Sequence, residues 1–339
     1  MIKIAYLMQD FMVGGIPTFL YNLASNINNE FECYFIATDN KNINPRFYDI
    51  GIPIYLGNDK STIVQYLKNN KIKIVQYGNK DLYRQCAISA DIGVIIERTA
   101  GPRSCGLPKE GVSHVVASTN GTVPLIRKNY DGPLSVIYNG VDLLQYNNSK
   151  IVNDKFTICY CARIGGVGQG FQYLIPAVIE ARRKSHKDIK LILIGDKPAG
   201  SAEDIRPLLK KLARPLDNDC IFTGQLLDPI PTMASADLYC SPALHHGISN
   251  SIIESCALSK PVIATNVGST DEIVHHGKNG YLIPPKNIKS ISDCIIKLIG
   301  SPNKLINFGS NGRKIVENQF NIKIQSKKYT DLYKKLLYV

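Results

Sequence analysis

Short apolar runs alternate with amphipathic stretches along the first part of the chain. Four of these runs have the length and the β-branched content of buried strands: IKIAYLM, KIKIVQY, IGVIIE and SHVVAS. Stretches with a helical spacing of apolar residues, such as IPTFLYNLASNI, lie between them. This alternation is typical of a parallel sheet with helices on both faces. We therefore predict a Rossmann-like domain over residues 1–145.

A second series of the same kind follows. FTICYCARI, KLILIGD, CIFTG, ADLYCS, PVIATN and GYLIPP are predicted strands, and FQYLIPAVIEARRK, DIRPLLKKLA and ISNSIIESCALS are predicted helices. They predict a second Rossmann-like domain over residues 152–318. The polar, Asn-rich stretch 143–154 has no periodicity and is the predicted linker. The expected fold class is therefore α/β, with two doubly wound domains in tandem that face a cleft.

The net charge limits the classes of binding partner that the sequence suggests. The chain has 339 residues, and its 40 Lys and Arg against 28 Asp and Glu give a net charge of +12. A surplus of this size suits an anionic membrane surface, a phosphorylated small molecule or nucleic acid, although a generally basic surface would also account for it. The lysines are dispersed and are not interleaved with exposed aromatics, so we expect no nucleic-acid groove.

Nothing in the sequence predicts a membrane span or a cleaved leader. No window approaches about 18 consecutive apolar residues, so any membrane contact would be peripheral. MIKIAYLMQDFMVGG alternates into a glycine turn, as a first strand does. The nine cysteines lie mostly in apolar runs, which favours buried thiols in a reducing compartment and predicts neither disulfides nor a structural zinc. We expect a cytoplasmic protein, with a peripheral location at the inner face of a membrane as a further option.

Ligands of doubly wound sheets bind beyond the carboxyl ends of the strands, so residues just after predicted strands are the candidates for a site. Gly14 and Gly15 lie between the first predicted strand and a helix. Adjacent glycines let a ligand approach the backbone, and the helix start offers unpaired N–H groups to an anion. A tight strand-to-helix turn is the alternative.

A second candidate is YCARIGGVGQGFQYLIPA, in which Arg163 and a glycine-rich loop separate a strand from a helix. The loop suits a phosphate, because its N–H groups, the helix start and the Arg163 guanidinium all favour an anion. A dinucleotide fingerprint would need glycine at position 171, where Phe171 stands. Asp196 at the end of the next predicted strand leaves a dehydrogenase as an alternative, since an acid there can bind a ribose.

The third candidate is LHHGISNSIIES. A helix starting near residue 248 would be capped by Ser249 or Asn250 and would present free N–H groups just after Gly247. Glu254 lies about two turns past Gly247 on the same face, where it could accept hydrogen bonds from a ribose or sugar diol. A solvated helix glutamate is the alternative, but the apolar neighbours of Glu254 predict a helix that is mostly buried.

Taken in order, several stretches resemble the C-terminal half of the retaining, nucleotide-sugar-dependent glycosyltransferases of the GT-B fold. They are ARIGGVGQGFQYLIPA, LILIGD, IFTGQL, DLYCSPALHHGISNSIIESCALSKPVIAT and GSTDEIVHHGKNGYLIPP, which together cover about residues 155–285. GGIPTFLYNLA and VIYNGVDLLQY carry a weaker similarity in the N-terminal half. The resemblance implies that the C-terminal domain holds the sugar nucleotide, that the N-terminal domain holds the acceptor, and that a helix in residues 321–339 returns to the N-terminal domain.

The resemblance also implies roles for single residues. Glu254 matches the second glutamate of the family's E-x7-E motif, which holds the nucleotide ribose. Gly247, Ile248 and Ser249 match the segment whose N–H groups touch the donor sugar or the phosphates. Arg163 matches the arginine that binds the diphosphate.

Two positions depart from the family's pattern. His246 stands where the first glutamate of the motif is expected, and Gln169 stands for the lysine that normally partners the arginine, in a loop one residue longer than usual. A neutral His246 would exchange hydrogen bonds with a sugar hydroxyl, and an imidazolium would offset the missing lysine. We expect Arg163 and His246 to be the catalytic residues, with Gly14, Gly15, Gln169 and the residues matched above binding the donor.

The implied function is transfer of a hexosyl or N-acetylhexosaminyl group from a nucleoside diphosphate sugar to a hydroxyl acceptor, in polysaccharide, glycolipid or other glycoconjugate assembly. We expect no metal or other cofactor beside the nucleotide sugar. The resemblance also implies that the leaving phosphate takes the acceptor's proton, so that little side-chain acid/base work is needed. A degenerate, non-catalytic subunit that supports an active partner is the alternative, and a sugar-nucleotide epimerase is a third. The donor base, the donor sugar, the acceptor and the oligomeric state stay open.

Two further groups of residues carry weaker predictions. The family often has a histidine at the end of an N-terminal strand, and here Glu97, Arg98 and Arg103 occupy that region, either supplying charge or pairing with each other as exposed residues. His275 and His276, in HHGKNG, are predicted to form a polar turn before a strand. A zinc site is not expected there, because adjacent histidines point in different directions and no cluster nearby completes a tetrahedral set.

Overall fold

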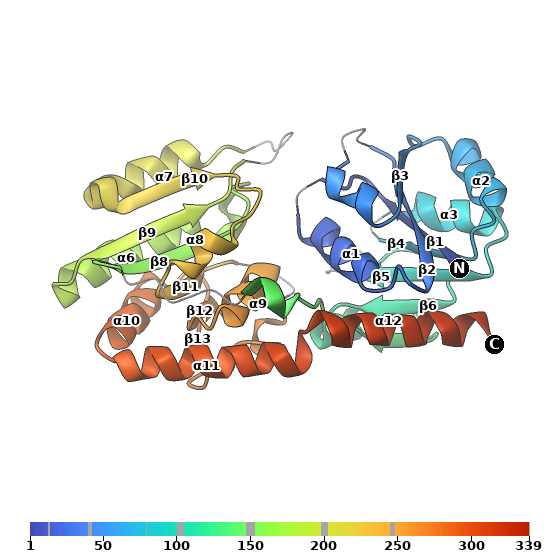
Figure 1. Cartoon of the computed structure of the whole chain (residues 1–339). Helices are drawn as coiled ribbons and strands as arrows, with labels where there is room; N and C mark the ends of the chain where they lie inside the picture. Colours follow the sequence, from blue (N-terminus) through green and yellow to red (C-terminus); the bar gives the residue numbers. More distant parts are fainter. Residues whose placement is uncertain are drawn as a thin grey trace. The chain divides into compact units, whose positions relative to one another are not determined.

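The chain consists of two compact units. The computed structural model describes residues 1–12, 14–39, 43–78, 80–99, 105–146, 153–197, 203–244 and 248–338. The first unit comprises residues 1–142 and 319–339, and the second comprises residues 143–318. Each unit is built around one parallel sheet covered by helices (Figure 1). The predicted site residues Arg103, His246 and Gly247 lie outside the described residues, so their roles stay predictions.

The first unit contains a seven-stranded sheet in the order β3-β2-β1-β4-β5-β6-β7. The strand order reverses beside β1, which is the doubly wound arrangement. The strands are β1 (Ile2–Met8), β2 (Phe31–Ala37), β3 (Ile52–Tyr55), β4 (Ile74–Tyr77), β5 (Val94–Thr99), β6 (His114–Ala117) and β7 (Leu134–Val136). The α-helices are α1 (Gly15–Ser25), α2 (Lys60–Asn69), α3 (Asp81–Ser89), α5 (Val123–Arg127) and α12 (Ile322–Leu337).

Hydrophobic cores lie on both faces of this sheet, because successive residues of a strand point to opposite sides. Ile96 of β5 belongs to the core formed with α1 and α12, and Ile95 belongs to the core formed with α2 and α3. The C-terminal helix α12 is part of the first unit, as predicted, since Tyr329 and Tyr333 are fully buried in the α1 core. A helix distant in sequence thus completes the first domain.

The second unit contains a six-stranded sheet in the order β10-β9-β8-β11-β12-β13. All pairs in it are parallel, and the order reverses beside β8. The strands are β8 (Phe156–Cys161), β9 (Ile189–Ile194), β10 (Cys220–Gly224), β11 (Leu238–Ser241), β12 (Val262–Thr265) and β13 (Gly280–Ile283). The α-helices are α6 (Phe171–Ser185), α7 (Arg206–Ala213), α8 (Ile230–Ala234), α9 (Asn250–Ala257), α10 (Ile288–Ile299) and α11 (Pro302–Gln319).

Glycines let α11 lie directly against the end of α9. A Cβ on Gly309 would lie 2.0 Å from the Ser259 carbonyl oxygen, and one on Gly312 would lie 3.3 Å from the Cys256 sulfur. The Arg313 guanidinium also donates to the Ala257 carbonyl at 2.7 Å. The C-terminal end of α9 is therefore held by α11.

The predicted linker is wrong in its first part. Residues 143–146 form a 3₁₀ helix, and Tyr146 is buried, with its carbonyl accepting a hydrogen bond from Arg313 at 3.1 Å. The units divide between Asp142 and Leu143 instead. None of the nine cysteines is in a disulfide. None of the helices in the described ranges combines the length and the apolar character needed to cross a bilayer.

Candidate functional site

The predicted site residues of the second unit gather at the carboxyl ends of its central strands. The segments that follow β8, β9 and β10 are joined by backbone hydrogen bonds, from Ile164 N–H to the Asp196 carbonyl and from Gly195 N–H to the Gly224 carbonyl, each 2.9 Å long. Arg163 stands two residues beyond β8 and is exposed. Its guanidinium makes no hydrogen bond or ion pair with another described residue, and is therefore available to an anion.

The glycine-rich loop is packed against the segment that follows β11. Leu244 N–H donates to the Gly168 carbonyl at 2.9 Å. Gly170 has a φ of +75°, and a Cβ there would lie 2.0 Å from the Pro242 carbonyl oxygen. Position 170 therefore requires glycine for both its backbone conformation and its close approach to Pro242.

Gln169, the residue that stands for the family's lysine, is hydrogen-bonded by a buried tyrosine of β8. The Tyr160 hydroxyl donates to the Gln169 backbone carbonyl at 2.9 Å and lies 3.2 Å from its side-chain Oε1. Tyr160 is on β8, with its ring packed on Phe171 of α6. The loop is therefore fixed by a buried tyrosine, and Gln169 brings no positive charge.

Helix α9 begins two residues later than the sequence predicts. Its first residue is Asn250 and its N-cap is Ser249, one of the two predicted caps, but the Ser249 side chain makes no capping hydrogen bond. The Ser249 hydroxyl instead lies 2.8 Å from the Ser251 hydroxyl, which donates to the Cys161 carbonyl at 3.0 Å. The Tyr239 hydroxyl donates to Ser251 at 2.7 Å. The first turn of α9 is thus bound to the end of β8.

Glu254 is half-buried on α9, and its carboxylate makes no hydrogen bond or ion pair with another described residue. Burial raises its pKa to about 7, and the negative charge of Asp228 adds to the shift. Burial also raises the pKa of the Cys161 thiol to about 12, with a further contribution from Glu254, which places the carboxylate near the end of β8. The solvated-glutamate interpretation is therefore wrong, because a desolvated carboxylate without a partner favours any donor that reaches it.

Asp196 is already paired, which removes support from the dehydrogenase alternative. Arg206 Nη1 lies 2.7 Å from its carboxylate, and the Lys197 N–H donates to the same oxygen at 2.7 Å. These two donors lower the pKa of Asp196, with the Lys197 N–H as the main cause. A ribose at this carboxylate would have to compete with an arginine.

The glycines of the first unit lie where β1 leads into α1. Gly14 is the N-cap of α1, with an extended backbone, and a Cβ there would approach only Pro17, at 3.8 Å. Neither conformation nor crowding requires glycine at this position. Gly15 is the first residue of α1. A ligand at these two residues stays a prediction.

The prediction that Glu97 and Arg98 are exposed is wrong. Both are buried on β5, and they cannot pair because neighbouring residues of a strand face opposite sides. Glu97 forms a buried ion pair with Lys109 at 2.9 Å and accepts a hydrogen bond from Tyr77 at 3.0 Å. Arg98 lies over the Phe19 ring at 3.8 Å and donates to Asn139.

The histidine pair at 275 and 276 forms a turn before β13, as predicted. His276 Nδ1 accepts a hydrogen bond from Leu282 N–H at 3.2 Å, and His275 N–H donates to Asn279 at 2.7 Å. Within the described ranges, no three His, Cys, Asp or Glu side chains come together as a metal site would require.

Several residues of the site were not predicted from the sequence. Tyr160 and Tyr239 come from buried strand faces, Ser251 comes from the buried face of α9, and Asp228 follows β10. The only sequence sign of Ser251 is a hydroxyl residue among the apolar neighbours of α9. Spacing rules mark residues after strands and do not mark the buried groups that hold them in place.

The match to a known family falls on this part of the chain. Residues 155–301 match the family model described as "Glycosyl transferases group 1". Over these residues the chain is similar to the group 1 glycosyltransferases. The matched segment contains β8 to β13 and every described residue of the site at their carboxyl ends.

Two curated relatives support the same assignment. The glycosyltransferase MJ1069 of Methanocaldococcus jannaschii is 25% identical over 66% of this chain. The capsular polysaccharide biosynthesis glycosyltransferase CapM of Staphylococcus aureus is 29% identical over 57% of this chain. The aligned parts span 59% and 50% of the lengths of these two relatives.

A solved structure shares the fold over nearly the whole chain. HepE of Anabaena in complex with UDP-glucose superposes with a TM-score of 0.86, covering 99% of this chain and 100% of HepE at 20% identity. The predicted fold class, two parallel-sheet Rossmann-like domains of the GT-B type, is therefore confirmed.

Proposed function

We propose that the protein is a retaining glycosyltransferase that moves a sugar from a nucleoside diphosphate sugar to a hydroxyl acceptor in glycoconjugate assembly. The main support for this proposal is a contact between two segments that are distant in the sequence. The Arg163 loop and the first turn of α9 are held together through Cys161 and Ser251. A guanidinium and a carboxylate, neither with a partner among the described residues, are thereby placed at one edge of a doubly wound sheet, where nucleotides bind.

Each side chain suits one part of a nucleoside diphosphate sugar. The Arg163 guanidinium would bind the diphosphate, with the backbone N–H groups of the glycine-rich loop beside it. The Glu254 carboxylate would accept two hydrogen bonds from a ribose diol. Those bonds replace the hydration that Glu254 loses on burial, so binding would favour the ionised form. Gln169, Gly247, Ile248 and Ser249 would complete the donor site.

The chemistry asked of the protein is positioning and charge stabilisation. The acceptor oxygen would attack the anomeric carbon from the face that the nucleotide leaves, and the leaving phosphate would take the acceptor's proton. Negative charge then develops on the diphosphate, so a fixed guanidinium lowers the barrier. His246 would contact the donor sugar or add a second positive charge. No metal is assigned a step in this scheme.

The neutral residue Gln169, which stands where the family has a lysine, is the observation that bears on the alternative function. Gln169 is held by Tyr160 and carries no charge, so transition-state stabilisation rests more heavily on Arg163. A non-catalytic subunit that supports an active partner is the second candidate, and this neutral position is the observation that favours it. A double variant, Arg163→Ala with Glu254→Ala, separates the two. It would abolish activity in an enzyme and would leave a supporting role intact.

A thermal-shift panel tests donor binding first. UDP, GDP and their glucose, N-acetylglucosamine and mannose derivatives are each added to the wild type and to the double variant. A ligand that binds only the folded protein stabilises it by mass action and so raises Tm. At a ligand concentration of 100 times Kd, the free energy of unfolding increases by about 2.7 kcal/mol. We expect one base to stabilise the wild type and to leave the double variant unchanged. Equal shifts in both proteins would place the nucleotide elsewhere and refute the assigned site.

A product analysis then tests the stereochemistry. The anomeric configuration of the transferred sugar, read from the coupling of its anomeric proton, should equal that of the donor. An inverted product would disprove the retaining mechanism while leaving the donor site in place.

A further inference from the structure

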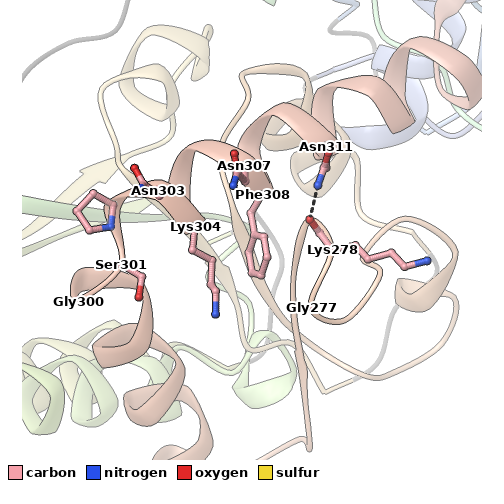
Figure 2. A pocket seen from close by; sticks show the side chains of 10 residues that line it. Gly277, Lys278, Gly300, Ser301, Asn303, Lys304, Asn307, Phe308 and Asn311 are labelled. Atoms are coloured by element: carbon pink, nitrogen blue, oxygen red, sulfur yellow. Dashed lines mark hydrogen bonds between the residues drawn. The ribbon is translucent and has the colours of Figure 1, made fainter.

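A cavity lies at the opposite edge of the second unit's sheet. It has a volume of about 710 Å³ and is bounded by the turn before β13 and by the junction of α10 and α11 (Figure 2). The turn precedes β13, so the cavity is at the amino ends of the strands, whereas the candidate donor residues follow carboxyl ends. It is open to solvent, its lysine and asparagine side chains are exposed, and its volume is in the range of small-molecule sites. It is therefore separate from the site described above.

One ridge of α11 carries a row of amides along this cavity. Asn303, Asn307 and Asn311 are spaced four residues apart and line it together. Positions i, i+4 and i+8 of a helix lie on one face, about 6 Å apart along the axis. Asn303 and Asn307 make no side-chain hydrogen bond with another described residue, and Asn311 Nδ2 donates to the Lys278 carbonyl at 2.8 Å. Each amide offers a donor and an acceptor, as vicinal sugar hydroxyls require.

The charge of the cavity is positive. Lys278 and Lys304 line it, and no aspartate or glutamate does. Neither ammonium forms an ion pair with a described residue, and Lys304 Nζ lies 3.5 Å from the Tyr281 hydroxyl. Figure 2 shows Lys304 and Phe308 extending from the same side of α11. An anionic group is therefore favoured over a neutral one.

The walls of the cavity are held in place by buried groups. Asn279 is fully buried, and its side chain accepts from His275 N–H at 2.7 Å and donates to the Ile273 carbonyl at 2.9 Å. The Phe308 ring packs on the Tyr281 ring at 5.4 Å. A turn and a helix fixed in this way need little ordering when a ligand binds.

We propose that this cavity binds an anionic saccharide, a sugar or short sugar chain that carries carboxylate or phosphate groups. The two ammonium groups pair with the anion, and the row of asparagine amides bonds the sugar hydroxyls. The volume exceeds what a lone phosphate needs, and the amide row has no role toward a simple ion. The proposal does not depend on the donor chemistry at the other edge of the sheet.

Calorimetric titration with defined probes tests the site. The probes are trigalacturonate, glucose 6-phosphate, neutral maltotriose and inorganic phosphate, each titrated into the Arg163→Ala, Glu254→Ala protein so that the donor site does not contribute. We expect one or both anionic sugars to bind, more weakly as salt rises. Adding Lys278→Ala and Lys304→Ala should weaken binding by about tenfold or more. Asn303→Ala with Asn307→Ala should also weaken it, and Lys314→Ala, on the same helix but outside the cavity, should not.

The outcomes that overturn the proposal are distinct. Equal affinity for maltotriose would remove the need for an anion, and equal affinity for inorganic phosphate would remove the need for a sugar. Absence of binding by both anionic sugars, or an equal loss in Lys314→Ala, would show that the cavity is not the site. Circular dichroism and Tm of each variant establish that it is folded.

Discussion

The Ser251 hydroxyl donates a hydrogen bond to the Cys161 carbonyl oxygen at 3.0 Å and so joins α9 to the end of β8. Arg163 follows two residues after Cys161, and Glu254 follows about one turn after Ser251. This single bond therefore helps to set the separation of a guanidinium and a carboxylate that lie 91 positions apart in the sequence. The donor site proposed above depends on that separation.

Removing the hydroxyl should loosen the site. Ser251→Ala is expected to destabilise the fold by about 1 kcal/mol, because α9 loses its hydrogen bonds to Tyr239 and to the Cys161 carbonyl, while those two groups still bond each other at 3.2 Å. Nucleotide affinity should fall with it. Ser292→Ala is a matched control, since the Ser292 hydroxyl is buried and has no hydrogen-bond partner in the described part of the chain, so its loss should be nearly neutral. Equal Tm changes in the two variants would contradict the role of the Ser251 bond.

Arg163 should contribute to turnover without contributing to stability. Its side chain is exposed and has no partner among the described residues, so Arg163→Ala should leave Tm within about 1 °C of the wild type. Loss of the charge opposite the developing diphosphate should lower kcat about 100- to 1000-fold. Arg183→Ala, which removes an exposed charge from α6, provides the comparison. Kinetics that are unchanged in Arg163→Ala would exclude it from the transition state.

Glu254 predicts a pH dependence of donor binding. Its pKa of about 7 means that the free protein carries a protonated carboxyl below that pH, and only the ionised form accepts both ribose hydroxyls. The Kd for a sugar nucleotide should therefore rise about tenfold for each pH unit below 7. A sugar nucleotide is the suitable probe because its diphosphate does not titrate there. In Glu254→Gln this part of the profile should flatten, and a profile that persists would assign it to another group.

The same residue predicts a change in stability. The folded-state pKa of Glu254 is raised above its unfolded value, so the folded form loses stability as pH rises through about 7. Glu254→Gln should therefore stabilise the unliganded protein by about 1–3 kcal/mol at pH 8 and have little effect near pH 4. Denaturant unfolding of the wild type and of Glu254→Gln at pH 8 and at pH 4 measures the stability difference at each pH. A variant that is less stable than the wild type at pH 8 would indicate a partner for the carboxylate.

Alanine substitutions at Gly170 and Gly224 should separate the cost of backbone strain from the cost of crowding. Both have positive φ, but a Cβ on Gly170 would meet the Pro242 carbonyl at 2.0 Å, whereas one on Gly224 would meet nothing within 4 Å. Gly224→Ala should cost about 1 kcal/mol, and Gly170→Ala should cost several times more and displace the loop that carries Gln169. Similar costs in unfolding experiments would mean that the loop can move away from Pro242.

The alternation of apolar runs was sufficient to predict two doubly wound domains, because buried parallel strands are continuous apolar segments. It did not mark β2, β3 or β7. The strands β3 and β7 are at the edges of their sheet and have only four and three residues, whereas β2 has seven residues and pairs on both sides, so neither length nor edge position explains its omission. Glu97 and Arg98 were misplaced for a different reason. Their partners Lys109 and Asn139 are distant in sequence, and a charged pair on a strand gives no sign of burial.

Only the residues that directly follow strands or begin the next helix could be predicted as site residues, because sheet topology alone fixes their region. Residues after strand ends meet at one edge of a parallel sheet, which located Arg163, Gln169 and Glu254 in the same region. The exact start of α9 and the buried bonds from Tyr160 and Ser251 depend on contacts between strand faces and helix faces. No spacing within one segment encodes such contacts.

The central claim is that this protein transfers sugar from a nucleotide donor bound at the Arg163 and Glu254 edge. It is tested most directly by measuring nucleoside diphosphate released from a panel of UDP- and GDP-sugars, with a mixture of hydroxyl acceptors, by the wild type and by the Arg163→Ala, Glu254→Ala variant. We predict turnover of at least one donor by the wild type and a loss of about 100-fold or more in the folded variant. Absence of both binding and turnover across the panel, or equal turnover by the two proteins, would contradict the account.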